Sequence, residues 1–241
     1  MSSVHDFDLL LRRWSKHTQL TAEDRAALLS LPYTRKSFGK DAYLVREAQP
    51  ATECQLLLRG FAFRQKLLRS GARQIISFHI PSEFVDLQNS VLGVADHSVQ
   101  SLNRCEAAII PRGPLMELAE ARPAIRRAMW IDTLIDASIF REWVVNVGRR
   151  DSRARIAHLL CELVKRLQAI GMGTGETFEF PLTQEQVADA TGLTAVHTNR
   201  TLQWLRRDGL IQLASGRLTV LDWEGLRNVG DFDELYLHQA V

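Results

Sequence analysis

Cysteine is scarce in this sequence of 241 residues, which contains only Cys54, Cys105 and Cys161. These three residues are odd in number and far apart, so they provide neither a disulfide framework nor a metal-binding motif. No apolar run approaches the roughly 20 residues that a membrane-spanning helix needs. The first residues also lack the basic and apolar segments of a signal peptide. The sequence therefore predicts a cytoplasmic protein without membrane contact, disulfides or a bound metal.

An excess of one charge is also lacking, because 30 basic residues stand against 28 acidic ones and the formal net charge is +2. This balance does not indicate a nucleic-acid partner. It does not exclude one either, since a DNA-binding protein can concentrate its basic side chains locally. The sequence has no phosphate-binding glycine loop and no spaced nucleophile and base, so we do not expect an enzyme. Its length and its 46% content of hydrophobic residues predict two globular domains.

The stretch from residue 182 to residue 207 predicts two short helices joined by a tight turn. Thr183 and Gln186 have the spacing of a capping box that starts a first helix. Gly192 suits the end of that helix, and Thr194 suits the cap of a second one. The second helix would bury one side and expose another, on which Val196, Arg200, Gln203 and Arg207 recur at helical spacing. This pattern is typical of a helix-turn-helix whose second helix enters the DNA major groove.

The flanking segments add strands to the predicted helix-turn-helix. Residues 177–180 alternate like a short strand, and residues 210–213 and 218–221 enclose Ala214-Ser215-Gly216-Arg217, which is a hairpin signal. A helix-turn-helix followed by a hairpin predicts a winged helix. Capped helices separated by a glycine also occur in proteins that never bind DNA. A winged helix used for protein contact, without specific DNA binding, therefore stays an alternative.

The first half of the chain predicts two helices within residues 1–33 and then short strands up to Pro111. The candidate strands are residues 42–45, 54–59, 61–68, 73–79, 99–102 and 105–110, a pattern that fits a sandwich or barrel. A long helix is predicted from Pro123 to Val147, followed by a hinge over residues 148–151 whose Asp151 would cap the next helix. The apolar residues of the long helix spread over more than one face, so it needs cover on two sides. Its second apolar side would be covered either by the same helix of another subunit or by the rest of this chain.

Three stretches of the sequence resemble the Crp/Fnr family of bacterial transcription regulators. Residues 151–160 resemble the first helix of its DNA-binding domain, and Gly209-Leu210-Ile211 resembles the entry into its wing. Residues 196–200 resemble a subgroup with His and Asn before an Arg. The resemblance implies an α+β protein with an N-terminal β-roll of the cyclic-nucleotide-binding type, a long dimerisation helix and a C-terminal winged helix-turn-helix. The corresponding expected segments are 1–121, 122–148, 149–222 and a tail, 223–241.

The resemblance also implies partners and contacts. We expect a homodimer that binds a near-palindromic double-stranded operator and acts on RNA polymerase. We expect Arg200 to contact a guanine through O6 and N7 and Val196 to pack on a thymine methyl group. His197, Asn199 and Gln203 would contact bases or phosphates beside them. Candidates for contacts to the DNA backbone are Thr183, Gln184 and Thr194.

The sequence departs from the cyclic-AMP-binding members of the family at the effector pocket. Those members carry Gly-Glu and then Arg-Ser to hold the cyclic phosphate, and the aligned positions here are Asp86-Leu87 and His97-Ser98. The Thr-Ser pair that meets the adenine becomes Phe140-Arg141. A mostly neutral histidine does not replace an arginine fork, and Asp86 would repel an anion. We therefore predict a regulator that does not depend on cyclic AMP, although Arg141 could supply a cation from the helix.

The sequence also gives expectations for cofactors and for the C-terminal tail. The N-terminal cysteine cluster of iron–sulfur family members is missing here, so this cofactor is not expected. A haem or small-molecule sensor stays an alternative, although His79 and His97 show no spacing of an axial pair. Constitutive activity is the other alternative. Residues 231–238 form an acidic, aromatic segment that we expect to pack on the DNA-binding domain.

Overall fold

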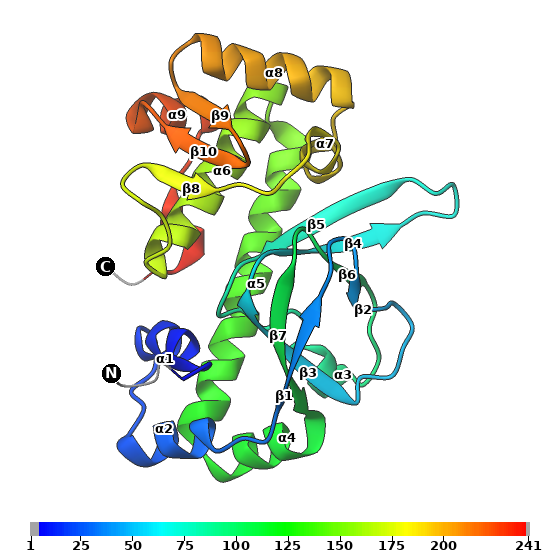
Figure 1. Ribbon diagram of the computed structural model, residues 1–241, viewed down its shortest axis with the longest axis vertical. Helices are drawn as coiled ribbons and strands as arrows, with labels where there is room; N and C mark the ends of the chain where they lie inside the picture. Colours follow the sequence, from blue (N-terminus) through cyan, green and yellow to red (C-terminus); the bar gives the residue numbers. More distant parts are fainter. Residues whose placement is uncertain (1–4, 240–241) are drawn as a thin grey trace. The chain divides into compact units, whose positions relative to one another are not determined.

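The computed structural model describes residues 5–239. They form two compact units (Figure 1). The roll unit comprises the described residues up to Lys66 and residues Ser77–Ala137. The winged-helix unit comprises Leu67–Ile76 and Ser138–Gln239. Within the described residues, no helix combines the length and apolarity needed to cross a membrane.

Two antiparallel sheets form the roll. One has the order β1-β7-β3 and the other the order β2-β6-β4-β5. The strands are β1 (Thr34–Phe38), β2 (Tyr43–Val45), β3 (Glu53–Arg59), β4 (Ala62–Leu67), β5 (Arg73–His79), β6 (Ser98–Ser101) and β7 (Cys105–Pro111). One cluster of buried apolar side chains joins the two sheets and includes Phe38, Leu57 and Val99. The six strands that the sequence predicts are therefore confirmed, with ends that differ by at most one residue.

Strand β1 (Thr34–Phe38) is not among the strands predicted from the sequence. Its residues Thr34–Ser37 are exposed, and only Phe38 is buried. The strand therefore has no alternation of apolar and polar residues, and its place is fixed by pairing with β7, in which Phe38 lies opposite Cys105. Long-range pairing, which leaves no local sequence signal, explains the omission.

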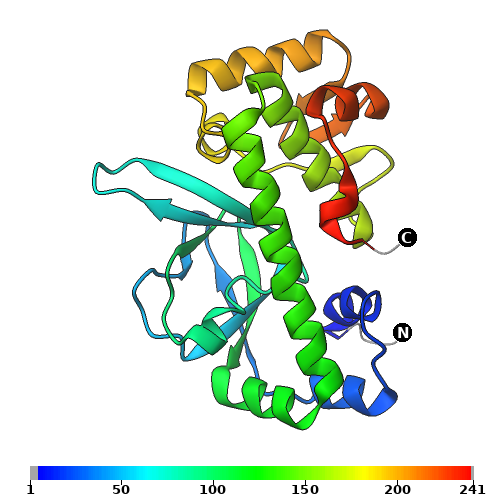
Figure 2. The ribbon, with the colours of Figure 1, turned by 180° about the vertical axis from the view of Figure 1, so that it is seen from behind.

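Helices cover one end of the roll. They are α1 (Asp8–Ser15), α2 (Ala22–Leu29), the short α3 (Asn89–Leu92), α4 (Arg112–Ala121) and the long α5 (Pro123–Arg149). Leu10 and Trp14 of α1, Leu115 of α4 and Ile125 of α5 share one apolar cluster with Leu56 of β3. Helices α1, α2 and α5 agree with the sequence prediction, whereas α4 is not foreseen. Figure 2 shows α5 as one continuous helix.

Helix α5 continues to Arg149, two residues beyond the predicted end at Val147. The predicted hinge over residues 148–151 is therefore too long, because Gly148 and Arg149 are helical. Arg150 and Asp151 remain as the connection. Asp151 then caps the next helix as predicted, since its carboxylate accepts hydrogen bonds from the backbone N–H groups of Arg153 and Ala154, both at 2.9 Å.

The winged-helix unit contains four α-helices after α5, one small sheet and a 3₁₀ turn among the residues described. These elements are α6 (Ser152–Ala169), β8 (Thr177–Glu179), α7 (Gln184–Thr191), α8 (Ala195–Arg207), β9 (Ile211–Ala214), β10 (Arg217–Val220), α9 (Trp223–Gly230) and η1 (Glu234–Leu237). The sheet order is β8-β10-β9. Helix α6 is buried along most of its length and packs against α7, α8 and α9. The predicted fold class, a roll, a long helix and a winged helix-turn-helix, is confirmed.

Candidate nucleic-acid interface

Capping hydrogen bonds define the first helix of the predicted helix-turn-helix. The N–H of Gln186 donates to Thr183 Oγ1 (3.1 Å), and the N–H of Thr183 donates to Gln186 Oε1 (2.9 Å). Gly192 ends the helix in the left-handed conformation, with φ of 64°. Its successor Leu193 donates its N–H to the carbonyl oxygen of Ala188 (3.1 Å). The capping box and the glycine turn are therefore both present as predicted.

Helix α8 is fixed at its start and along its buried side. Thr194 caps it, because its Oγ1 accepts from the N–H of His197 at 3.2 Å. Thr198, Leu202 and Leu205 face the interior and are buried. The helix therefore has one defined orientation relative to α6 and α7, against which it packs. A rigid helix holds the side chains of its other face in place for recognition.

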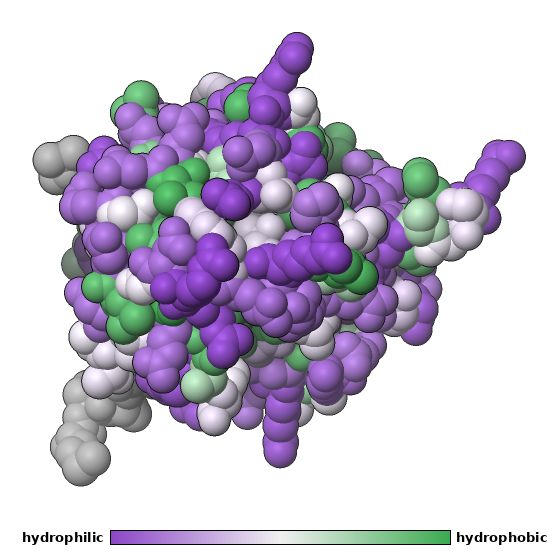
Figure 3. Space-filling model, turned by 90° about the horizontal axis from the view of Figure 1, so that it is seen from above, coloured by the Kyte–Doolittle hydropathy of each residue, from purple (hydrophilic) through white to green (hydrophobic). Residues whose placement is uncertain are grey.

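The opposite face of α8 is open to solvent. Val196 is 63% exposed, and Arg200, Gln203 and Arg207 are exposed beside it. The guanidinium of Arg200 has no ion-pair partner among residues 5–239. The surface seen in Figure 3, which includes α8, is coloured mainly hydrophilic with small separate hydrophobic areas. This face is available to contact a large polar partner.

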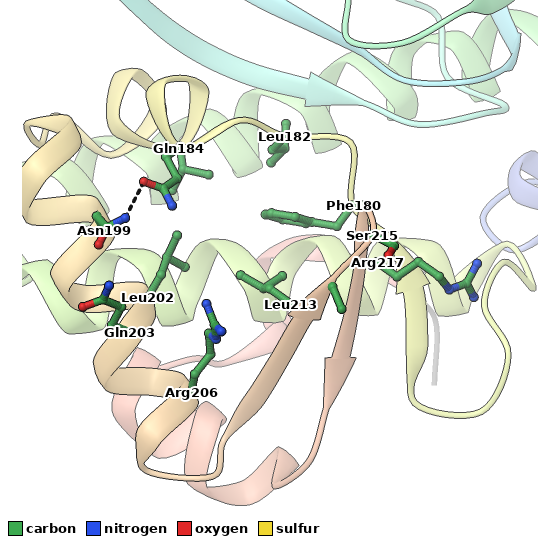
Figure 4. Close-up of a pocket in the computed structure, with 13 residues that line it drawn as sticks. Phe180, Leu182, Gln184, Asn199, Leu202, Gln203, Arg206, Leu213, Ser215 and Arg217 are labelled. Carbon is green, nitrogen blue, oxygen red and sulfur yellow. Dashed lines mark hydrogen bonds between the residues drawn. The ribbon is translucent and has the colours of Figure 1, made fainter.

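Three further predicted contact residues lie at the helix starts. Thr183, Gln184 and Thr194 are at the beginnings of α7 and α8, where each keeps part of its surface in solvent. Gln184 is also tied to α8, because the amide nitrogen of Asn199 donates to its Oε1 at 2.8 Å (Figure 4). The hydrogen bond joins two residues that are predicted separately as DNA contacts, and each amide orients the other.

Two arginines hold the helix-turn-helix in place and are missed in the sequence analysis. Arg155 of α6 donates from Nε to the carbonyl oxygen of Arg150 (2.8 Å) and from Nη1 to that of Thr191 (3.0 Å). Arg153 stacks over the ring of Trp204 at 4.1 Å from its centroid. These contacts join α6 to the end of α7 and to α8. Both residues precede the motif by about 30 positions, so no local spacing indicates their roles.

The wing is tighter than predicted. The sequence predicts a connection of four residues from Ala214 to Arg217, but Ala214 and Arg217 are paired strand residues. Only Ser215 and Gly216 form the turn, with φ of 51° and 71°. Two consecutive positive φ angles are typical of the two-residue hairpin turn that matches the twist of the strands. The turn therefore holds the tip of the wing close to its strands.

A pocket of about 270 Å³ lies between α8, the start of α7 and the wing, and we call it the α8–wing pocket (Figure 4). Phe180, Leu182, Leu202 and Leu213 supply apolar lining. Gln203, Arg206, Ser215 and Arg217 supply polar groups. The predicted contact residues Gln184 and Asn199 also line the pocket, as Gln203 does. Arg206, Ser215 and Arg217 are not among the predicted contacts, because α8 and the wing are separated by a turn whose geometry the sequence does not specify.

The predicted effector residues of the roll are engaged in internal hydrogen bonds. Asp86 is buried, and its Oδ1 accepts from the N–H of Gln55 (2.8 Å) and from the thiol of Cys54 (3.3 Å). Burial raises the pKa of Asp86 to about 6. Ser98 Oγ accepts from the N–H of Glu47 (3.0 Å). In this structure, Asp86 is an acceptor that fixes β3.

His97 is also enclosed. Its Nδ1 lies 2.6 Å from Asp96 Oδ1 and its Nε2 lies 3.4 Å from Gln88 Nε2. Burial lowers the pKa of His97 to about 4, and the neighbouring cation of Arg64 acts in the same direction. The imidazole is therefore neutral near pH 7. Phe140 and Arg141, the remaining predicted effector residues, lie on the part of α5 that belongs to the winged-helix unit, and Phe140 is 46% exposed.

A buried arginine of the roll, Arg64, is missed in the sequence analysis. Its Nη1 lies 2.8 Å from Asp136 Oδ2 on α5, and its Nη2 donates to the carbonyl oxygen of Val85 at 3.2 Å. Both Arg64 and Asp136 belong to the roll unit. The two residues are 72 positions apart, so the pairing leaves no local signal. The positive charge inside the roll therefore already has an anion from the protein itself.

The tail packs on the DNA-binding domain as predicted. Glu162 of α6 is fully buried and accepts hydrogen bonds from Trp143 Nε1 (2.9 Å) and from the hydroxyl of Tyr236 (3.0 Å). Arg166 adds a third partner at 3.0 Å. Burial raises the pKa of Glu162 while these donors stabilise its charged form. The tail is therefore part of the structural core of the winged-helix unit.

Two family profiles match the chain. Residues 154–229 match a Crp-like helix-turn-helix domain, and residues 35–122 match a cyclic nucleotide-binding domain. Among similar proteins is the transcriptional activator protein FnrL of Cereibacter sphaeroides, 26% identical over 217 residues, which are 89% of this chain and 86% of that protein. The nitrogen fixation regulation protein FixK of Bradyrhizobium diazoefficiens is 28% identical over 188 residues, 78% of each chain.

Solved structures support the same fold. FixK2 from Bradyrhizobium japonicum superposes with a TM-score of 0.76 at 22% identity, covering 83% of this chain and 98% of that one. A regulator named CLP from Xanthomonas campestris superposes with a TM-score of 0.67 at 16% identity, covering 84% of this chain and 100% of that one. At these identities the likeness concerns the fold alone.

Proposed function

Because the chain belongs to the Crp/Fnr family of transcription regulators, we propose that it binds a near-palindromic DNA operator as a homodimer and regulates transcription without cyclic AMP. The observation that carries this proposal is the exposed face of α8, on which Arg200 has no partner among the residues described. Capping, the contacts of Arg155 and the buried side of α8 hold this face rigidly. The similar proteins FnrL and FixK are named as a transcriptional activator and a regulation protein.

Base recognition follows from the chemistry of the exposed face. In the major groove, the guanidinium of Arg200 would donate two hydrogen bonds to N7 and O6 of a guanine. Val196 has no hydrogen-bonding group and would pack on a thymine methyl. Gln203 and His197 flank these two residues on the exposed face. Thr183, Gln184 and Thr194 would contact the DNA backbone from the helix starts and fix the orientation of α8.

Dimerisation would use the exposed side of α5. Trp130 (67% exposed) and Leu134 (53% exposed) are followed by Ala137 and Val144 at spacings of three, four and seven residues. Such spacing produces the apolar seam of a parallel coiled coil. The other side of α5 already packs inside this chain, where Ile125 and Ala128 are buried. A second copy of α5 would cover this seam at Trp130, Leu134, Ala137 and Val144, with Arg141 as the charged residue between the last two.

Independence from cyclic AMP is supported by the interior of the roll. A buried cyclic phosphate needs charge-assisted donors to offset its lost hydration. His97 is neutral near pH 7, and the buried cation of Arg64 is paired with Asp136. Asp86 adds a carboxylate that would repel the phosphate at neutral pH. An entering anion would have to separate Arg64 from its carboxylate without gaining a new cation from the roll.

The proposal extends to partners and cofactors. A bound dimer would contact RNA polymerase, as the activator names of its relatives suggest, and would act in the cytoplasm, where the chromosome lies. We also propose that the protein carries no iron–sulfur cluster. The three thiols are buried, and burial raises the pKa of each, which disfavours the thiolate that a cluster needs. A haem or small-molecule sensor remains the second candidate, and an absorption spectrum of the purified protein, with a Soret band or without one, decides it.

The experiment that tests the proposal compares wild-type protein with Arg200→Ala in binding-site selection. We expect the substitution to cost about 1–3 kcal/mol at one base pair of each half-site and to relax the preference there. Unchanged affinity and an unchanged motif would show that Arg200 has no role in recognition. A wild-type protein that selects no sequence at all would favour the alternative, a winged helix used for protein contact.

A further inference from the structure

The α8–wing pocket contains a cation that the proposed recognition of bases does not use. Arg206 lies on the last turn of α8, and Figure 4 shows its side chain directed into the space between the helix and the wing. Its guanidinium forms no hydrogen bond or ion pair with any residue from 5 to 239. Arg217 also lines the pocket, but its side chain points away from the space in the same view.

The lining has two kinds of surface. Phe180, Leu202 and Leu213 provide an apolar wall, and the guanidinium of Arg206 and the hydroxyl of Ser215 lie on the polar part of the lining. A ligand that fits must therefore combine a small, weakly polar body with an anionic group. One nucleotide unit of a DNA backbone has this composition, because the deoxyribose is largely apolar and the phosphodiester carries one negative charge.

The position of the pocket agrees with this occupant. Gln203 belongs both to the exposed face of α8 and to the rim of the pocket. When that face lies in the major groove, the phosphates that border the groove lie beside α8, on the side where the helix and the wing enclose the pocket. The backbone is therefore brought to the pocket by the same docking that brings the bases to Arg200.

We propose that the α8–wing pocket holds one phosphate of the operator backbone and its deoxyribose, with Arg206 binding the phosphate. The inference rests on the proposed DNA-binding function and adds a site to it. Arg206 would supply affinity that is independent of sequence, whereas Arg200 supplies base preference. A contact to phosphate releases counterions, so its contribution falls as the salt concentration rises.

The test measures operator binding by Arg206→Ala at several salt concentrations. We expect affinity to fall about tenfold, equally for the selected operator and for unrelated DNA, because the variant cannot make the charge-assisted hydrogen bonds to the phosphate. The slope of log affinity against log salt should decrease by about 1 for each phosphate that is no longer neutralised. The selected motif should stay unchanged. Arg206→Lys, which keeps the charge, should recover most of the salt slope.

Arg207→Ala is the matched control. Arg207 is the next residue of α8, is 76% exposed at its side chain, lies beside Asp208 at 3.6 Å and is not part of the pocket lining. The substitution removes the same charge from the same turn. If both substitutions reduced the affinity and the salt slope equally, general electrostatic attraction would explain the effect and the pocket would have no specific role.

Ethylation of single backbone phosphates locates the contact. Ethylating the phosphate that enters the pocket should weaken wild-type binding at one position in each half-site and should not weaken Arg206→Ala further. Equal interference with both proteins at every position would overturn the proposal while leaving DNA binding intact. Failure of the wild-type protein to bind any DNA would overturn the proposed function and this site together.

Two arms of the experiment separate the possible sources of the phosphate. Deoxyribose 5-phosphate and inorganic phosphate are titrated against wild-type protein and Arg206→Ala, with both proteins checked for folding by circular dichroism. We expect no saturation at micromolar concentrations, since a single isolated unit lacks the rest of the docked strand. Tight binding that depends on Arg206 would instead assign the pocket to a free phosphorylated ligand and overturn the assignment to DNA.

Discussion

Two exposed arginines of α8 and the buried arginine of the roll differ in whether the protein supplies an anionic partner. Arg200 and Arg206 are exposed and have no anionic partner within the described part of the chain. Arg64 is buried, and its partner Asp136 lies 2.8 Å away. A solvated cation without a partner is free to bind an external anion, whereas a buried cation needs an internal one. The same residue type therefore indicates a binding surface in one unit and a structural tie in the other.

The roll contains an internal ion pair that contributes to its structure without a bound nucleotide. The ion pair of Arg64 and Asp136 joins β4 to α5 within the roll unit. The carboxylate comes from the chain, so no ligand concentration controls the contact. On the exposed face of α8 the anion must come from outside the protein, because the charge of Arg200 would be neutralised only by bound DNA. We infer that the protein binds DNA without a ligand in the roll, and that regulation depends on its abundance or on a ligand, other than cyclic AMP, that alters this basal binding.

The largest expected effect comes from breaking the dimer on which the α8 face depends. Leu134→Glu places a charge in the proposed seam of α5, where a second copy would bury it. We expect a monomer in sedimentation velocity at micromolar concentration and a loss of operator affinity of at least about 100-fold, because one half-site is no longer linked to the other. Glu120→Gln on α4, outside the seam, is the control. A monomeric variant that still bound the operator with wild-type affinity would contradict the dimer.

The next effect concerns the internal partner of the buried arginine. Asp136→Asn removes the anion from Arg64 and should lower the free energy of unfolding by about 2 kcal/mol. Breaking a fully buried ion pair usually costs more than this. The expected loss is smaller here because the side chain of Asp136 is 37% exposed. Arg200→Ala also removes one charge, but its free energy of unfolding should stay within about 0.5 kcal/mol of the wild-type value. Denaturant unfolding measures the free energy of unfolding of each variant. Equal values for the two variants would contradict the claim that Arg64 depends on its internal partner while Arg200 has none.

A smaller effect concerns the pH dependence of stability. Burial raises the pKa of Asp86 to about 6 from 3.8, so the stability that its protonated form contributes is present below pH 3.8 and is lost as pH rises through 6. His97 has the opposite sign, because its pKa is lowered to about 4 from 6.5. The stability that the neutral imidazole of His97 contributes to the fold is present above pH 6.5 and is lost as pH falls towards 4.

Asp86→Asn tests this assignment. The asparagine keeps an acceptor for Gln55 but does not titrate. Relative to wild type, the variant should gain on the order of 2 kcal/mol in the free energy of unfolding between about pH 4 and pH 7. Urea unfolding across this range provides the measurement. A constant difference between the two proteins at every pH would show that Asp86 does not titrate there.

The smallest expected effect is that of the cyclic nucleotides. Calorimetry with cyclic AMP and cyclic GMP should detect no binding in the low micromolar range, and neither nucleotide should change operator affinity. If binding occurs through the α5 side, Arg141→Ala will abolish it and His97→Ala will not. A low-micromolar dissociation constant together with tighter operator binding would overturn the prediction, since an effector must bind the two states of the protein differently.

Local signals made the helix-turn-helix predictable. The capping box of Thr183, the glycine at position 192 and the cap at Thr194 each act within four residues, and all are present in the structure. The same is true of the Asp151 cap. Strand β1 and helix α4 escaped prediction for the opposite reason. Neither has a clean apolar period, and their places depend on contacts with β7 rather than on a local pattern.

The candidate site was predictable in part. The exposed face of α8 followed from helical spacing, but the α8–wing pocket did not, because it depends on a two-residue turn that places Ser215 in the same lining as Arg206. The partner of Arg64 also could not be inferred, since Asp136 lies on another element 72 residues away. Asp86, which alignment places at an effector position, is an internal acceptor for Gln55. Alignment gives a position in the chain but not the hydrogen bonds that occupy a side chain.

Binding-site selection from random DNA, with purified wild-type protein and no added nucleotide, tests the central claim most directly. Because Arg200 and Arg206 of α8 have no anionic partner among the described residues, we expect the α8 face to bind DNA without any ligand in the roll. The selected sequences should then form a near-palindrome with half-site centres about one helical turn, roughly 10 base pairs, apart. The absence of an enriched sequence, or its appearance only after cyclic AMP is added, would contradict the account.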